Sequence, residues 1–391
     1  MIKTCSKLLL ASALFSPILM ADAKVKKTNF HAQWQKTYGG TDDDIANAVI
    51  MLEDGKTAVI GTCKSFDAKR SDICVTRLNK EGQTEWRTLL GGKKSDKGIA
   101  ISRASDGNLL ILGEGKSFEH GGQDLYVAKL SLEGKVLWEN SFGGDRDEYA
   151  GGIAGTNDGG VLLVGDSESF SKKGYRDIYI VRLDKNGKVL TTKTIGGKLN
   201  DEAKAMTRTA DGNFMMVGSR EIKNSGDADF FLMKLNQNGE KIWARTLGEG
   251  YNDVLYAVAP TPDGGIVATG KTRSYNSEQT DLPIMYFDKN GKLIWFKIYG
   301  FSYYDEGNAI TMTKNGNYMV AGKTNSMGKG DFDNYVLTLD KKGNLLWSST
   351  YGGVNKDIAN GITRTTDGSV VIVGESDSFS RSKKFFIIKL K

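Results

Sequence analysis

The chain has 391 residues, among them 48 glycines, 4 prolines and 6 tryptophans, and it carries a formal net charge of +6 at pH 7. This balance is typical of a soluble globular protein and excludes a collagen-like or proline-rich disordered chain. The positive charge is modest and is not gathered in a basic block, so we expect no nucleic-acid partner.

The first residues have the pattern of an export signal. Lys3 and Lys7 precede an apolar run at residues 8–20, and a small-x-small cleavage site follows at residues 21–23. The run is too short to span a bilayer. We therefore predict a cleaved signal peptide at residues 1–23 and a periplasmic or secreted mature protein without a membrane span. A retained N-terminal anchor is the alternative.

Two cysteines, Cys63 and Cys74, fall on neighbouring predicted strands of the mature chain. In an oxidising compartment they could form a cross-strand disulfide, and the alternative is a pair of buried thiols. The whole chain has only two histidines, His31 and His120. With so few soft ligands, we predict no metal site of the zinc type.

Internal repeats dominate the sequence. The tryptophans recur every 52 residues except for one double step of 105, and they are Trp34, Trp86, Trp138, Trp243, Trp295 and Trp347. Thr191 takes the tryptophan place within the double step. A turn pair recurs in the same register, at Asp54-Gly55, Asp106-Gly107, Asp158-Gly159, Asp211-Gly212, Asp263-Gly264, Asn315-Gly316 and Asp367-Gly368. The chain therefore contains seven copies of one unit, and we expect the tryptophans to pack between units.

Each unit has the pattern of four short strands. In the first copy we expect them at residues 46–52, 57–63, 73–78 and 84–89. The Asp-Gly pair between the first two predicts a two-residue hairpin turn in which both residues have positive φ. No helical period competes. Four-stranded units repeated seven times indicate the blades of a β-propeller.

The two ends of the chain are complementary fragments of one unit. The last copy has its third strand at residues 385–390 and no fourth, whereas an isolated fourth strand lies at residues 33–38. We therefore predict an all-β, seven-bladed propeller in which the N-terminal strand completes the last blade. Such closure removes open sheet edges. It makes residues 24–391 a single domain, and we expect a monomer.

The repeat resembles a known group. The shared pattern is an aromatic-Gly-Gly entry or its remnant, an Asp-Gly turn, a strand glycine, and then a Leu-Asp-x-x-Gly-x-x-x-Trp run, as at residues 339–347. This pattern is similar to the secreted bacterial propeller repeats of the delta-60 or PQQ-like type, over nearly the whole mature chain. The resemblance implies the propeller fold. Members of this group include enzymes, assembly factors and uncharacterised envelope proteins. We cannot place the cofactor residues of the PQQ enzymes in this chain, and we expect no cofactor.

One position, at the start of the first strand, is acidic in all seven copies. These residues are Asp44, Asp96, Glu148, Asp201, Asp253, Asp305 and Asp357. They could form a ring at the mouth of the central channel that holds a cation or a basic ligand. Alternatively, each carboxylate accepts backbone N–H bonds from its own Gly-Gly turn. We favour the structural interpretation, because every blade must turn and pack, and because seven unpaired carboxylates would repel one another.

The clearest departures from the repeat are aromatic and lie in the loops of blades five and six. They are Tyr251, Tyr275, Phe301, Tyr303 and Tyr304. In propellers, the loops between blades share one face with the loops between second and third strands. Several rings on one face could bind a sugar, a peptide or a protein. The alternative is that they fill space left by lost glycines or are scattered surface aromatics.

These patterns predict a function class. We expect a non-catalytic scaffold in the cell envelope that binds a protein, peptide or glycan. The alternative is a hydrolase or lyase with its site at the channel mouth, although the sequence has no catalytic-triad, P-loop or dinucleotide motif. A polar pocket that joins His120 or Arg176 to acidic channel residues would favour the enzyme. An aromatic patch near Tyr303 would favour binding.

Overall fold

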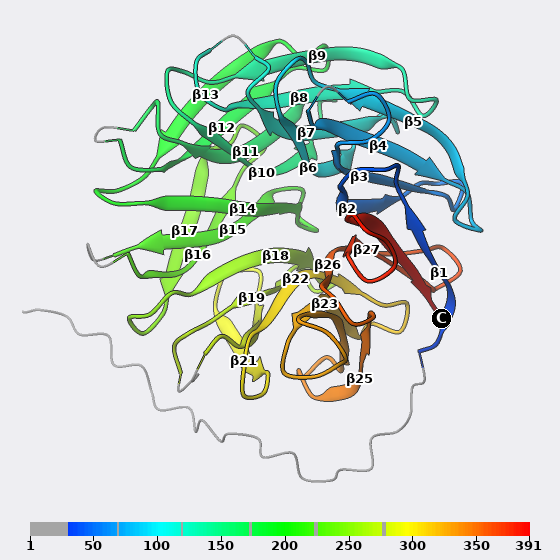
Figure 1. The fold of residues 1–391 in the computed structure, drawn as a ribbon. Helices are drawn as coiled ribbons and strands as arrows, with labels where there is room; N and C mark the ends of the chain where they lie inside the picture. The colour runs from blue at the N-terminus through cyan, green and yellow to red at the C-terminus, as the bar shows by residue number, and fades with distance from the viewer. Residues whose placement is uncertain (1–29, 69, 119, 172–173, 223–225, 276–278) are drawn as a thin grey trace, which may run out of the picture.

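The structure is a computed structural model that describes residues 30–391 apart from 69, 119, 172–173, 223–225 and 276–278, so the predicted signal peptide lies outside the described residues. The described strands form seven four-stranded antiparallel sheets around a common centre (Figure 1). This arrangement confirms the predicted seven-bladed all-β propeller. Across the described stretches, no helix has the length and hydrophobicity of a membrane-spanning segment.

Blades 1 to 6 each use four consecutive strands, and blade 7 combines the last three strands with the first one. The first strands, nearest the centre, are β2 (Asp44–Met51), β6 (Asp96–Arg103), β10 (Glu148–Gly155), β14 (Asp201–Arg208), β18 (Val254–Pro260), β22 (Asp305–Met312) and β26 (Asp357–Arg364). The second strands are β3 (Thr57–Cys63), β7 (Leu109–Gly115), β11 (Val161–Ser167), β15 (Phe214–Glu221), β19 (Ile266–Lys271), β23 (Tyr318–Thr324) and β27 (Val370–Ser376). The third strands are β4 (Asp72–Leu78), β8 (Asp124–Leu130), β12 (Asp177–Leu183), β16 (Ala228–Leu235), β20 (Leu282–Phe287), β24 (Asp333–Leu339) and β28 (Lys384–Leu390). The outer strands are β5 (Thr84–Leu90), β9 (Val136–Phe142), β13 (Val189–Ile195), β17 (Lys241–Leu247), β21 (Leu293–Tyr299), β25 (Leu345–Tyr351) and β1 (Ala32–Tyr38).

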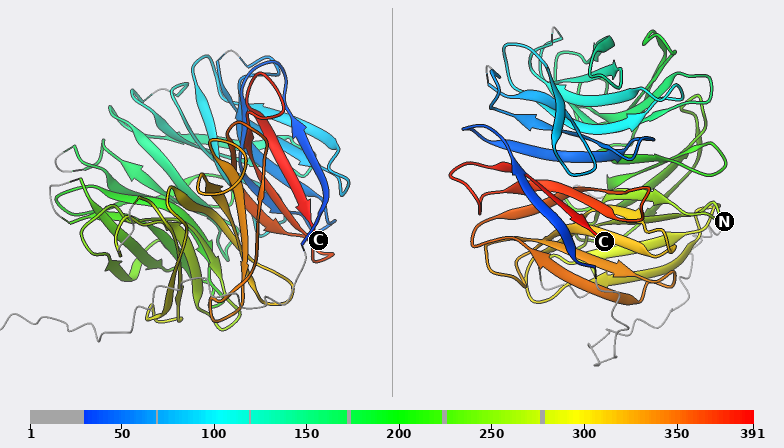
Figure 2. Two further views of the ribbon diagram at one scale, coloured as in Figure 1. Left: turned by 60° about the horizontal axis from the view of Figure 1, so that its bottom comes forward. Right: turned by 90° about the vertical axis from the view of Figure 1, so that its right-hand side faces the viewer.

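The ring is closed by the first strand. β1 lies antiparallel to β28, with Tyr38 opposite Phe385, and the two strands run side by side in Figure 2. His31 and Lys391 add two backbone hydrogen bonds of 3.1 Å beyond the strand pair. The N-terminal strand therefore supplies the outer strand of blade 7, as the sequence predicts.

The apolar core consists of seven layers, each between two neighbouring blades. The layer between blades 1 and 2, for example, contains Ile60 and Val75 from one blade and Ile111 and Tyr126 from the other. Small residues on the first strands let the blades approach closely: a Cβ atom at Gly98 would lie 2.5 Å from the carbonyl oxygen of a residue in blade 1. Close packing is therefore distributed around the ring rather than concentrated in one centre.

The tryptophans connect neighbouring blades at the outer strands. Trp86 donates its Nε1–H to the carbonyl oxygen of Leu132 in blade 2 (2.9 Å), and its ring covers the turn glycine Gly134. Trp138 and Trp295 make the corresponding bonds to the next blades. The ring of Trp347 packs against Phe30, with the centroids 5.6 Å apart. These contacts confirm the expected packing role of the tryptophans.

The turn between the first and second strands differs from the prediction. The N–H of Gly55 donates to Leu52 O (3.0 Å), and only the glycine has positive φ (+79°). Among the non-glycine residues that the structure describes, positive φ occurs only at Phe66, Asp67 and Tyr275, so the predicted two-residue turn is wrong. The observed turn, from Leu52 to the left-handed Gly55, is instead the usual three-residue hairpin loop, a type I turn followed by one left-handed residue. It is favoured here because Asp54 Oδ1 accepts the N–H of Lys56 (3.0 Å).

A second repeated contact ties this turn to the third strand. In blade 3, the buried Arg182 contacts Asp158 (2.5 Å) and donates to the carbonyl oxygen of Gln237 in blade 4 (3.0 Å). The equivalent ion pairs are Arg77–Asp54, Lys129–Asp106, Lys234–Asp211 and Lys389–Asp367. Blade 6 has Asn315 and Thr338 at these positions, so the acid and the cation are lost together.

Ring closure gives the first testable prediction. We expect a chain that begins at Gly39 to melt at least about 5 °C below the full chain, because it lacks β1 and the contact of Trp34 with the turn at Gly82. Thermal unfolding followed by circular dichroism measures this difference. An unchanged melting temperature would show that β1 does not stabilise the ring.

The repeated ion pair gives a second prediction. The Thr156 hydroxyl, the Gly160 N–H and Arg182 lower the pKa of Asp158 from 3.8 to about 2, so its stabilising effect is present above pH 4 and is lost as the pH falls from about 4 to 2. Asp158→Asn should lower the melting temperature by a few degrees at pH 7, and the difference should disappear near pH 2. The exposed Asp331 has no ion pair among the described residues, so Asp331→Asn is the matched control. A difference for Asp158→Asn that is the same at both pH values contradicts the assignment.

Candidate functional site

The loops that precede each blade and the loops that join second to third strands lie together on one side of the ring, which we call the loop face. Thr280, from a loop of the second kind in blade 5, forms a bridge with Tyr304, from the loop that precedes blade 6. At the corresponding place between blades 1 and 2, the N–H of Asp96 donates to Ser71 O (2.7 Å). The predicted acidic and aromatic residues all belong to this face.

The seven repeated carboxylates are buried within the loop face. In blade 1, Asp44 accepts N–H bonds from Gly40 (2.9 Å), Lys64 (3.1 Å) and Ser65 (3.2 Å). It therefore connects the loop that precedes the blade with the loop that follows the second strand.

The same arrangement recurs around the ring. The glycine four residues before the acid donates its N–H at Gly92–Asp96, Gly144–Glu148, Gly197–Asp201 and Gly353–Asp357. In blade 6 the Phe301 N–H makes this bond to Asp305 (2.9 Å), so the bond survives the loss of the glycine. In blade 5 the carboxylate of Asp253 accepts bonds from the hydroxyls of Thr272 and Ser274. The carboxylates hold the loops together, and within the described residues no three His, Cys, Asp or Glu side chains are grouped to hold a metal.

The structure also reveals a repeated Ser-aromatic pair directly after the second strand. The Ser65 hydroxyl accepts the N–H of Asp42 (3.1 Å), and the following Phe66 packs beneath the Arg87 guanidinium (3.6 Å). The equivalent pairs are Ser117-Phe118, Ser169-Phe170, Ser274-Tyr275 and Ser378-Phe379, and blade 6 has a methionine in place of the ring, at Ser326-Met327. This motif was missed from the sequence, although its 52-residue spacing is visible there.

Tyr275 occupies this repeated position in blade 5. Its ring packs edge-on against Phe296, with the centroids 4.9 Å apart, in the apolar layer between blades 4 and 5. The side chain is half-buried, and burial raises its pKa. The structure therefore separates Tyr275 from the other four aromatic candidates.

The remaining four aromatics form an exposed group, which we call the aromatic patch: Tyr251, Phe301, Tyr303 and Tyr304. They lie in the adjacent loops that precede blades 5 and 6, with exposed fractions of 59%, 42%, 58% and 42%. The loop backbone is fixed, because the Tyr303 N–H donates to Ser326 (3.1 Å) and the Tyr304 N–H donates to Asn325 (2.7 Å). Rings presented by a fixed backbone lose little conformational entropy when a partner binds.

Among the described residues, Arg176 forms ion pairs with acidic side chains, whereas His120 forms none. Its guanidinium contacts Glu202 (3.0 Å) and Glu168 (3.5 Å) and covers the ring of Tyr149 (3.8 Å). Burial alone would raise the pKa of Glu202, but Lys204 and Arg176 hold it below its ordinary value. Glu202 is therefore ionised at neutral pH. His120 is exposed in a different loop, and its backbone N–H donates to Asp124 (3.3 Å).

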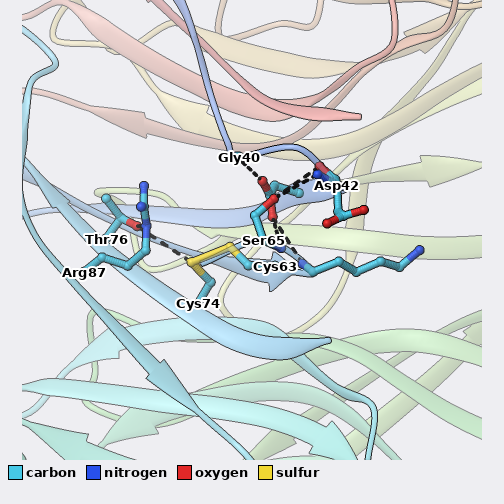
Figure 3. The surroundings of a disulfide bond; sticks show 9 residues. Gly40, Asp42, Cys63, Ser65, Cys74, Thr76 and Arg87 are labelled. Carbon is cyan, nitrogen blue, oxygen red and sulfur yellow. Dashed lines mark hydrogen bonds between the residues drawn. A yellow bond between two sulfur atoms is a disulfide. The ribbon is translucent and has the colours of Figure 1, made fainter. Parts of the chain in front are cut away.

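A disulfide joins Cys63 on β3 to Cys74 on β4, with Cα atoms 5.7 Å apart (Figure 3). Both residues are fully buried, and Cys74 lies opposite the strand glycine Gly61. In five other blades the residue opposite this glycine is aromatic, namely Tyr126, Tyr179, Phe231, Tyr335 and Phe386. In blade 1 the disulfide thus takes the place of a large ring. A disulfide that joins cysteines 11 residues apart stabilises the folded state by on the order of 3 kcal/mol.

No protein-family model matches the sequence. Regulatory protein FlaEY of Caulobacter vibrioides is 26% identical over 164 residues, which cover 36% of this chain and 17% of FlaEY. The match thus spans less than a fifth of that relative.

Two solved structures share the fold at low identity. A protein of unknown function from Dyadobacter fermentans is 12% identical, with 93% of this chain and 100% of that chain covered and a TM-score of 0.55. The Pan2 WD40 domain of Neurospora crassa is 10% identical, with 92% and 95% covered and a TM-score of 0.56. At these identities the similarity identifies the propeller fold alone.

Proposed function

We propose that this propeller is a non-catalytic binding scaffold of the cell envelope, and that the aromatic patch is where it contacts a protein, peptide or glycan partner. The observation that carries the proposal is the exposure of four large rings on the loops that precede blades 5 and 6, the second of which is held by backbone hydrogen bonds. Tyrosine is enriched among the residues that dominate binding energy, because it offers a large rigid surface with a polar end.

The proposed location rests on two features. The N-terminal residues have the export pattern, and the Cys63–Cys74 disulfide is of the kind that forms and persists in oxidising compartments. We therefore propose a periplasmic or secreted protein.

The alternative is a hydrolase or lyase at the channel mouth. Such an enzyme needs a side chain free to accept or donate a proton. Glu202, the acid beside Arg176, is instead held by Arg176 and by Lys204 (2.9 Å). Because two cations already neutralise the charge of Glu202, this residue is a poor general acid or base, and we favour a binding function over an enzymatic one.

Replacing two rings tests the aromatic patch. We expect Tyr303→Ala combined with Tyr304→Ala to reduce partner capture at least tenfold while leaving the melting temperature within about 2 °C, because both side chains are exposed. Tagged protein incubated with envelope extract, followed by quantitative mass spectrometry, measures the capture.

Phe379→Ala is the matched control, since Phe379 is an exposed ring (47%) of the repeated Ser-aromatic pair in blade 7. The proposal is supported when the wild-type and Phe379→Ala proteins enrich the same partner and the double variant does not. Equal enrichment by all three proteins rules out the patch as the contact site.

A further inference from the structure

A polar cavity of about 320 Å³ opens on the loop face at blades 3 to 5, next to the aromatic patch. Its volume lies within the range of small-molecule sites. The charged residues of its wall are Arg176, Glu202, Lys204, Glu221 and Lys271, and they come from three different blades. Asn252, which follows Tyr251 of the patch, also lines it.

Two of the wall residues are placed by β-bulges. In every blade the first strand has a bulge, and the bulged residue is Lys204 in blade 4 and Tyr256 in blade 5. In blade 1 this residue is Asn47, whose side-chain amide donates to Gly98 O in the next blade (2.6 Å). Asn308 and Asn360 make the same inter-blade bond. Blades 4 and 5 therefore have Lys204 and Tyr256 where other blades have an asparagine that bonds to the next blade. β-Bulges often redirect side chains next to binding and active sites.

Both acids of the wall are already bound by protein donors. Glu202 accepts bonds from Arg176 (3.0 Å) and Lys204 (2.9 Å). Glu221 accepts the Asn200 amide (2.9 Å) and the Gly226 N–H (3.1 Å). Glu202 is therefore paired with two cations, whereas Glu221 is held by two neutral donors.

Two cations of the wall, Lys271 and Lys204, have N–H groups that can still donate hydrogen bonds to a ligand. Within the described residues, Lys271 has no carboxylate within ion-pair distance, and its Nζ lies 5.7 Å from the centre of the Tyr256 ring. Lys204 has three N–H groups, of which Glu202 takes one; its Nζ is also 4.0 Å from the buried Asp166. A half-buried ammonium group without a carboxylate partner, as at Lys271, favours an anionic ligand.

We propose that this cavity binds a sugar acid. Its carboxylate would accept bonds from Lys271 and Lys204, and its ring would lie against Tyr256. The Asn252 side-chain amide, which can both donate and accept, suits a hydroxyl group. The inference goes beyond the aromatic patch and stands without it, since none of these contacts involves the four patch residues.

The test is a calorimetric titration of the full chain with D-glucuronate, with D-glucose as the neutral counterpart and inorganic phosphate as the plain anion. We expect glucuronate to bind and glucose to bind at least tenfold more weakly. Lys271→Met should weaken glucuronate binding about tenfold, whereas Lys271→Arg should retain it. Lys241→Met, at an exposed lysine of β17, is the matched control and should change nothing.

Three outcomes overturn the proposal. The first is that the folded wild-type protein does not bind glucuronate. The second is that Lys271→Met binds glucuronate with the same affinity as the wild type. The third is that phosphate binds as tightly as glucuronate and that Tyr256→Leu does not change glucuronate affinity. The last outcome would leave a general anion site. None of these results depends on partner capture, so the aromatic patch and the cavity can fail separately.

Discussion

The contact between neighbouring blades is the interaction on which the whole structure depends. No blade has a core of its own, because the described apolar residues are buried in layers that each take side chains from two blades. The bulged asparagines at the centre and the tryptophans at the rim strengthen the same contacts. A row of such blades would leave one apolar face open at each end, and pairing β1 with β28 removes both open faces at once.

The sequence predicted this architecture because its landmarks are separated by a constant interval. A 52-residue spacing of tryptophan and Asp-Gly pairs is enough to count blades, and alternation within each copy is enough to locate strands; residues 57–63 were predicted and β3 is Thr57–Cys63. The turn geometry could not be predicted in the same way. Asp-Gly is compatible with two hairpin loops, and the choice follows from the bond that Asp54 accepts from the Lys56 N–H.

The candidate sites were harder to predict, for reasons that differ from residue to residue. Tyr275 and Tyr303 both follow a serine, yet Tyr275 lies at a repeated position where its ring packs between blades and Tyr303 lies in a loop where its ring is exposed. Tyr256 and Lys271 are brought together by the β18–β19 hairpin of blade 5, and Lys204 joins them only because the ring places blade 4 beside blade 5. For Lys204 and Tyr256 the sequence signal is a difference at one repeat position, which holds asparagine in blades 1, 6 and 7 but lysine in blade 4 and tyrosine in blade 5.

The pairing of β1 with β28 also bears on how the molecule folds. It joins residue 32 to residue 390, so this contact has almost the largest sequence separation that the chain allows. Bringing such distant segments together costs loop entropy before any contact compensates for it, and topologies of this kind fold slowly. Until residue 390 has been synthesised, the growing chain is an incomplete arc with unsatisfied strand edges at both ends. The incomplete arc, with its exposed strand edges and apolar faces, is therefore the form of the chain that is most prone to misassociation.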